Sequence, residues 1–309
     1  MGFVKMADAV AQTGDGSFGF WDGTYNHLVG GWAVSSSPQT FKTHWRSDND
    51  GVTFSALSDF DYRFHTAATC VVNNVAYIVG GDTLSPTYDG DWRRSSHKYE
   101  NGAWSQIAAN PGIANRCLCQ LVYLNDEFFL IGGQSSITTG IVYYDTVLRS
   151  TDGLNTFTEV VSDTKTFGMQ TNLAWGAYAT HRGKIWRVCG RQHSSLGTDT
   201  AIFSSVDGIN WDYRGRFRGT GRNYLRLLSH NGRLWVFNGH NSRTNEYSPT
   251  GNISDYWIID ELNGGRLVQT FMGSTGWSAR HAPCIWSSPR GIFCFSGSVS
   301  VSDIWLLEQ

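Results

Sequence analysis

The chain has 309 residues, of which 16% are charged and 14% are aromatic, and its formal net charge at pH 7 is -2. Proteins that bind nucleic acid usually carry a clear basic excess, so this balance argues against a polyanion-binding surface. No window of 18 apolar residues occurs, and residues Met1–Asp8 lack the apolar stretch typical of a secretory signal. We therefore predict a protein that folds in the cytoplasm and is not inserted in a membrane.

In chain order, the first recurring feature is a tight turn between two short apolar stretches, repeated about every 50 residues. Asn, Asp and Gly suit such turns because they tolerate the positive φ that a β-hairpin requires. The turns fall at Asp22-Gly23, Asn73-Asn74, Asn125-Asp126, Arg182-Gly183, Asn231-Gly232 and Arg290-Gly291. A period of this size indicates an array of similar small units.

Three further features recur at a fixed phase after each turn. The second apolar stretch ends at Gly30-Gly31, Gly80-Gly81, Gly132-Gly133, Cys189-Gly190, Asn238-Gly239 and Ser296-Gly297. A third stretch often opens with Asp, at Asp145, Asp199, Asp255 and Asp303. A later turn precedes a large apolar residue, at Phe54, Trp104, Phe157, Trp211 and Leu267. Each unit is therefore predicted to hold four short strands.

The sequence contains six first hairpins but only five fourth strands, because it ends in a third strand at Ile304–Gln309. The missing strand is supplied by Phe3–Ala7, which closes the ring and protects the sheet edges. We predict an all-β fold, a single six-bladed β-propeller with four-stranded blades whose C-terminal blade is completed by the N-terminal strand. The expected blades cover roughly 12–58, 59–110, 111–162, 163–216, 217–272, and 273–309 with 1–11.

The pattern resembles kelch-like propellers, which carry Gly-Gly after the second strand and an aromatic residue in the fourth. The later turns resemble the Asp-box of sialidase-type propellers, at Ser47–Phe54, Ser150–Phe157 and Ser205–Trp211. The likeness covers nearly the whole chain and implies the fold, not a function. Asp-boxes usually lie on the outer rim, where the Asp caps backbone N–H groups and the aromatic residue packs between blades.

The six cysteines fall in the predicted inner strands, at Cys70, Cys117, Cys119, Cys189, Cys284 and Cys294. We interpret them as small buried hydrophobic residues. Their spacing contains no Cys-x-x-Cys pair, so no zinc site is predicted, and we predict no disulfide between Cys284 and Cys294. No cofactor is expected.

An arginine recurs at the entrance to the first strand and predicts a ligand site at the channel mouth. Equivalent positions in a ring converge there, and the planar arginine fork suits a carboxylate. The predicted mouth residues are Arg63, His65, Arg116, Arg222, Tyr224, Arg280 and His281. The alternative is structural: Arg-x-His at this position is a kelch signature whose Arg bonds loop carbonyls.

The loops between second and third strands are long and polar, which favours a second set of binding residues. Aromatic side chains mixed with Arg, Asn and Asp are typical of sugar or protein recognition. The residues expected to bind here are Trp92, Arg93, Arg191, His193, His240, Arg243, Glu246 and Tyr247. The alternative is an ordinary solvated loop.

The function predicted is a non-enzymatic recognition module that binds a glycan or protein receptor through its loop face. A surface-exposed phage virion protein, such as a tail or decoration component beside other virion proteins, is the setting we favour. The first alternative is an enzyme acting on an acidic sugar. It is either a sialidase-like hydrolase with Tyr224, Glu246 and Asp59 or Asp61. Or it is an epimerase or mutarotase whose general acid or base is supplied by His65, His193, His240 or His281. A structural docking role is the second alternative.

Overall fold

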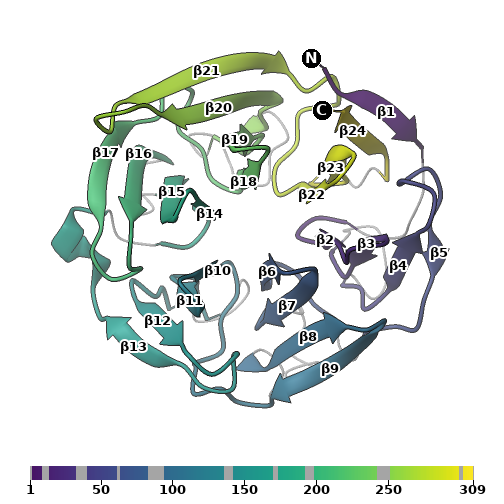
Figure 1. The fold of residues 1–309 in the computed structure, drawn as a ribbon, viewed down its shortest axis with the longest axis horizontal. Coiled ribbons are helices and arrows are strands. Elements are labelled where there is room, and N and C mark those ends of the chain that lie inside the picture. The colour runs from purple at the N-terminus through teal and green to yellow at the C-terminus, as the bar shows by residue number, and fades with distance from the viewer. Residues whose placement is uncertain are drawn as a thin grey trace.

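A computed structural model describes residues 2–8, 14–32, 40–60, 63–82, 94–135, 142–169, 173–191, 198–241, 251–298 and 302–308. The described chain forms six antiparallel sheets of four strands each, arranged radially around a central axis (Figure 1). In five sheets the strands follow one another in chain order from the axis to the rim, and in the sixth the N-terminal strand lies at the rim beside the C-terminal strand. This arrangement is a six-bladed β-propeller, and it confirms the predicted fold.

Blades 1 to 3 are formed by residues 18–161, and the strands of each blade are given from the axis to the rim. Blade 1 consists of β2 (Phe18–Trp21), β3 (Asn26–Val29), β4 (His44–Ser47) and β5 (Ser55–Ala56). Blade 2 consists of β6 (Ala68–Val72), β7 (Val75–Val79), β8 (Ser96–Glu100) and β9 (Ala103–Ala108). Blade 3 consists of β10 (Gln120–Leu124), β11 (Glu127–Ile131), β12 (Val147–Ser150) and β13 (Thr158–Val161).

Blades 4 and 5 repeat the plan after a short 3-10 helix, η3 (Thr164–Phe167), and blade 6 combines both ends of the chain. Blade 4 consists of β14 (Ala177–His181), β15 (Lys184–Arg191), β16 (Thr198–Ser205) and β17 (Asp212–Arg216). Blade 5 consists of β18 (Arg226–His230), β19 (Arg233–Phe237), β20 (Asp255–Glu261) and β21 (Leu267–Ser274). Blade 6 consists of β22 (Cys284–Ser288), β23 (Gly291–Phe295), β24 (Ile304–Glu308) and β1 (Val4–Ala7).

The ring closes where the N-terminal strand pairs with the C-terminal blade. In antiparallel register, β1 places Val4 opposite Leu306 on β24. Beside the strand, the ring of Phe3 packs edge-on against Phe237 and Trp277, at centroid distances of 6.0 and 4.5 Å. The predicted closure is therefore confirmed, and its pairing is reinforced by aromatic packing against the neighbouring blade.

Left-handed backbone at the tight turns explains the recurrent Asn, Asp and Gly. Asn73 and Asn74 have φ of 51° and 65° in the hairpin of blade 2. At the rim, Ser205 Oγ accepts from Gly208 N at 2.8 Å, and Asp207 Oδ1 accepts from Asn210 N at 2.7 Å. Gly208 lies against the ring of Phe129 in blade 3, where a Cβ would come within 2.4 Å of it. The turn therefore needs glycine both for its φ and for the contact between blades.

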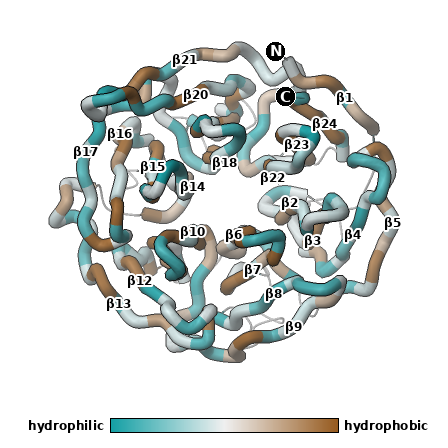
Figure 2. Tube along the Cα trace, viewed as in Figure 1, coloured by the Kyte–Doolittle hydropathy of each residue, from teal (hydrophilic) through white to brown (hydrophobic). Residues whose placement is uncertain are grey.

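The hydrophobic core lies between neighbouring blades. One cluster joins β11 of blade 3, through Phe129 and Ile131, to Ile185 and Phe203 of blade 4. Polar and apolar stretches accordingly alternate around the whole ring (Figure 2). All six cysteines are free, and five of them are buried. Full burial of one large apolar side chain contributes about 1.5–3 kcal/mol, so these faces dominate the free energy of folding.

Candidate functional site: the axial cavity

A closed ring of backbone hydrogen bonds surrounds the axis where the chain enters the innermost strands. At six equivalent positions the residue has positive φ, and its N–H donates to the carbonyl of the corresponding residue in the preceding blade. The N···O distances range from 2.9 to 3.5 Å. The ring consists of Gly16, Thr66, Leu118, Trp175, Tyr224 and Ala282. Left-handed backbone in non-glycine residues costs free energy, so its repetition around the axis marks the mouth as a constrained element.

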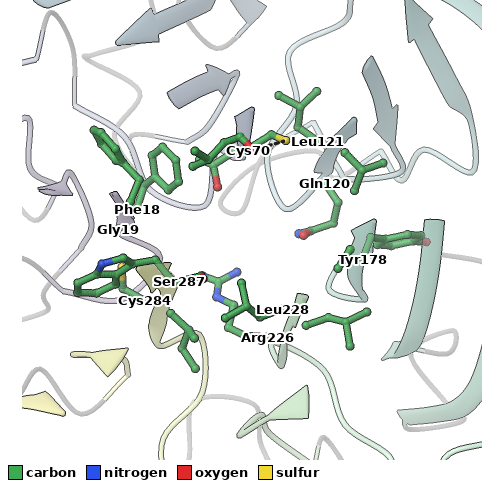
Figure 3. Close-up of a pocket in the computed structure, with 18 of the residues that line it drawn as sticks. Phe18, Gly19, Cys70, Gln120, Leu121, Tyr178, Arg226, Leu228, Cys284 and Ser287 are labelled. Atoms are coloured by element: carbon green, nitrogen blue, oxygen red, sulfur yellow. Dashed lines mark hydrogen bonds between the residues drawn. The ribbon is translucent and has the colours of Figure 1, made fainter. Parts of the chain in front are cut away.

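A cavity of about 1100 Å³ follows the axis and is lined by the innermost strand of every blade. The wall mixes aromatic rings, aliphatic side chains, hydroxyls and amides (Figure 3). Among its described lining residues, Arg226 is the one side chain of the Lys, Arg, Asp and Glu types. A concave cavity of this size is the usual setting of a ligand site.

Arg226 opens β18, two residues beyond the ring position Tyr224. Its Nε donates to the carbonyl of Pro283 in blade 6 at 2.7 Å, which fixes the orientation of the guanidinium. Figure 3 shows this group and the amide of Gln120 both projecting into the central space. Gln120 occupies the equivalent position of blade 3, two residues beyond Leu118. The repeat therefore places the two side chains at the same level of the channel.

Buried titratable groups adjoin Arg226 at the mouth. Burial raises the pKa of Asp15 to about 7, and the positive charge of Arg226 acts in the opposite direction. Burial lowers the pKa of His65 to about 4 and that of His281 to about 3, so both imidazoles are neutral at pH 7. His281 Nε2 lies 3.6 Å from Asp15 Oδ2. Asp15 therefore gains or loses a proton near neutrality, whereas His65 and His281 do not.

The predicted mouth arginines lie at the strand entrances, but their hydrogen bonds point away from the axis. Arg222 is fully buried and forms a bidentate pair with Asp255, with 3.1 Å between Nη2 and Oδ2. Arg280 pairs in the same way with Asp303, at 2.7 and 3.2 Å. Both also donate to the carbonyl that precedes the blade's glycine. This geometry matches the structural alternative, in which the arginine bonds loop carbonyls.

Arg116 and Arg63 also donate to backbone carbonyls. Arg116 is buried, donates to Gly132 O at 3.2 Å and lies 4.3 Å from the ring of Tyr144. Arg63 is half-buried and donates to Thr40 O at 3.0 Å. Neither residue lines the axial cavity.

The other predicted mouth residues do gather at the axis. The ring of Tyr224 stacks on Trp175 at 5.0 Å and contacts His281 at the same distance. His240, predicted as a loop residue, is buried and lies 5.4 Å from His281. His65 is buried beside Gly16, where a Cβ would come within 2.6 Å of its ring. Of these residues, Tyr224 lines the cavity, and the three histidines lie around it.

Most of the predicted loop residues cannot be placed. Trp92, Arg93, His193, Arg243, Glu246 and Tyr247 lie outside the described residues. Arg191 ends β15, and its backbone pairs with Thr198. Their role in ligand binding stays a prediction.

The carboxylates suggested for hydrolysis are not part of the described cavity wall. Asp59 pairs with Lys42 at 3.2 Å and is exposed. Asp22 caps a turn by accepting from Thr24 N and Tyr25 N at 2.8 and 2.7 Å. Asp61 and Glu246 lie outside the described residues. Within the described chain, no three His, Cys, Asp or Glu side chains form a metal-binding group.

Sequence reasoning missed Arg226 and Gln120. The arginines predicted at the mouth recur at equivalent positions of several blades. Arg226 has no equivalent arginine in the other blades, so this pattern does not include it. A usable signal was present: the position two residues beyond the ring is occupied by Phe18, Ala68, Gln120, Ala177, Arg226 and Cys284. One charged residue among otherwise neutral ones is anomalous at an axial position.

Comparison with known proteins does not assign the chain to a family. No protein-family description matches it, and no curated protein is similar to it in sequence. In the described residues, no helix has the length and hydropathy needed to cross a membrane. The fold and the cavity therefore carry the functional argument.

Proposed function

We propose that this propeller is a non-enzymatic recognition module that binds a glycan on its axis and through the loop face around it. The observation that carries the proposal is the axial cavity, which is wide enough for a sugar and reached by the innermost strand of every blade. Its wall combines apolar surface with many hydroxyl and amide groups, and a sugar likewise combines apolar ring faces with hydroxyls.

The side chains that line the cavity suit a carbohydrate. Trp21, Tyr123 and Trp175 offer rings to the apolar face of a sugar, while Asn74 and Asn231 offer amides to its hydroxyls. These groups are neutral, so they bind without requiring a particular charge on the ligand. The composition, with 13 Trp and 13 Tyr in 309 residues, agrees with this use.

Binding is favoured over hydrolysis by the chemistry of the described wall. Glycoside hydrolysis usually needs two carboxyl groups facing the same bond, and the described lining residues include neither Asp nor Glu. The mouth histidines His65 and His281 have pKa values lowered by burial to about 4 and about 3, below the range that suits an acid–base group at pH 7.

Kinship with kelch-like and Asp-box propellers forms part of the proposal. It is supported by the Gly-Gly pairs and by the Ser–Asp turns, in which Ser150 Oγ bonds Asp152 Oδ1 at 2.9 Å and accepts from Leu154 N at 3.0 Å. The setting we propose, a surface-exposed phage virion protein, is supported by the Gly- and aromatic-rich composition. A protein receptor at the loop face is the alternative ligand.

A glycan-array screen with neutral and acidic sugars tests the proposal. Val71 lines the cavity with 41% of its surface exposed, so Val71→Trp should fill the channel without disturbing the core. Val206, 57% exposed on the rim, provides the matched control Val206→Trp. We expect binding by the wild type and the control, and loss of binding in Val71→Trp with an unchanged melting temperature. Absence of glycan binding by the wild type would contradict the proposal and favour a protein receptor.

A further inference from the structure

Arg226 differs from the buried arginines Arg187, Arg222 and Arg280 because it forms no ion pair within the described chain. Nε is bonded to Pro283 O, but the two terminal nitrogens bond no described residue and form no ion pair within the described chain. By contrast, Arg187, Arg222 and Arg280 each have an aspartate partner. A half-buried guanidinium with two free nitrogens in a cavity offers a site for an external acceptor.

We infer that the axial cavity binds a carboxylate-bearing ligand, with Arg226 holding the carboxylate and Gln120 donating beside it. The inference rests on the proposed function, since it names the chemical class of ligand that the same cavity takes. An acidic sugar, such as a hexuronic acid, satisfies both.

The geometry favours a carboxylate over other anions. The terminal nitrogens of a guanidinium form a planar fork that matches the two oxygens of a carboxylate in parallel hydrogen bonds. A phosphate carries a charge of about -1.5 to -2, which one arginine does not balance. Arg226 is the one charged side chain of the described wall, so the cavity provides a single positive charge.

Preorganisation strengthens the site. The bond between Nε and Pro283 O spans blades 5 and 6, so the guanidinium is already oriented before a ligand arrives. Gln120 has no hydrogen-bond partner for its amide within the described chain, and it occupies the level of Arg226 in blade 3. The hydroxyl of Thr69 in blade 2 lines the same cavity.

Isothermal titration with glucuronate and glucose tests the inference on the full chain. The variants are Arg226→Gln, which removes the charge, and Arg290→Gln, which removes an arginine that lies outside the cavity wall, in the hairpin between β22 and β23, and pairs with Glu308. We expect glucuronate to bind the wild type and Arg290→Gln alike. Arg226→Gln should bind it at least about tenfold more weakly, because the variant loses the charge-assisted hydrogen bonds of the guanidinium fork. Glucose affinity should be the same in all three.

The outcomes separate the inference from the proposed function. Equal affinity of the wild type for glucuronate and glucose, or unchanged glucuronate affinity in Arg226→Gln, would overturn the inference and leave glycan recognition standing. A second measurement covers the case in which neither sugar binds. Side-chain nitrogen NMR of the labelled arginines is followed during titration with sodium acetate against sodium chloride at equal ionic strength. A saturable shift of Arg226 with acetate supports the carboxylate site alone, and no shift overturns it.

Discussion

Arg222 and Arg226 lie four residues apart in blade 5, and their guanidinium groups have different surroundings. Arg222 is fully buried, and its hydrogen bonds go to Asp255, Asn238 and Thr220 within its own blade. Arg226 is held through one nitrogen by Pro283 and presents the rest of its fork to the cavity. The hydrogen bonds of Arg222 are all made within the fold, whereas the terminal nitrogens of Arg226 bond no described residue.

The difference follows from the partner that the repeat supplies. Arg222 and Arg280 both meet an aspartate that opens the third strand, Asp255 and Asp303. At the position of Arg226 the other blades carry neutral residues, and Arg226 forms no ion pair with an aspartate of the described chain. In a repeat protein, a charge that recurs with its counter-charge indicates structure, and a charge that occurs once indicates a use specific to that site.

The largest effect is expected when the structural arginine is removed. Arg222→Ala leaves Asp255 half-buried without its cation and two backbone carbonyls without a donor, so we expect a loss of about 3–5 kcal/mol in the free energy of unfolding. Arg226→Ala should cost about 1 kcal/mol or less, since it breaks one hydrogen bond. Urea denaturation measures both. Equal losses of unfolding free energy in the two variants would contradict the distinction between a structural Arg222 and a ligand-binding Arg226.

The next effect concerns two carboxylates: Asp15, which lies near Arg226, and Asp303, which pairs with the structural arginine Arg280. Burial raises the folded-state pKa of Asp15 from its ordinary 3.8 to about 7. The folded protein therefore holds a proton that the unfolded chain releases, and stability is lost as pH rises from 3.8 through 7. Asp15→Asn removes this loss, so the variant should be more stable than the wild type at pH 8 by up to about 4 kcal/mol, and similar at pH 4.

Asp303 provides the opposite control for this measurement. Burial disfavours its ionisation, yet hydrogen bonds from Arg280 and Trp305 outweigh burial and hold the pKa of Asp303 below its ordinary value. Its contribution is therefore present above pH 3.8 and is lost as pH falls through the folded pKa. Asp303→Asn should be less stable than the wild type at pH 8. A gain there would show that the Arg280 pair does not stabilise the fold.

A smaller effect links Asp15 to the carboxylate site. As pH rises from 6 to 8, Asp15 ionises and its negative charge competes with the ligand for Arg226. The affinity for glucuronate should therefore fall, by at most about tenfold. His65 and His281 stay neutral in this range, because burial lowers their pKa values to about 4 and about 3. Cys284 and Cys294 also stay neutral, because burial raises the pKa of Cys284 to about 12 and that of Cys294 further. Asp15→Asn should bind equally at both pH values. If the glucuronate affinity of the wild type does not change between pH 6 and pH 8, Asp15 does not affect the carboxylate site.

The smallest effect separates charge from shape. Arg226→Lys keeps the positive charge but lacks the planar fork, so glucuronate should bind a few-fold more weakly, with the free energy of unfolding unchanged within about 0.5 kcal/mol. Arg222→Lys loses the bidentate pair with Asp255 inside the protein, and it should be clearly less stable. If Arg226→Lys binds as tightly as the wild type, charge alone suffices at the cavity.

The architecture could be predicted because its signals are local. Turn residues such as Asn73-Asn74 need positive φ, and a missing fourth strand required a partner, which β1 provides. The site could be predicted only in part. The repeat phase places Tyr224 at the cavity wall and His281 beside it, but the phase does not show whether an arginine turns inward or sideways. That depends on Asp255 and Pro283, which lie 33 and 57 residues from their arginines.

The sixth blade makes the propeller sensitive to the timing of its own synthesis. The strand β1 is made about 300 residues before its partner β24, an interval of about 15–60 s at 5–20 residues per second. During that time its backbone edge and the ring of Phe3 have no blade to join. A neighbouring nascent chain competes for the strand in this interval. Slower translation therefore favours exchange of β1 between copies, although the finished ring offers no such opening.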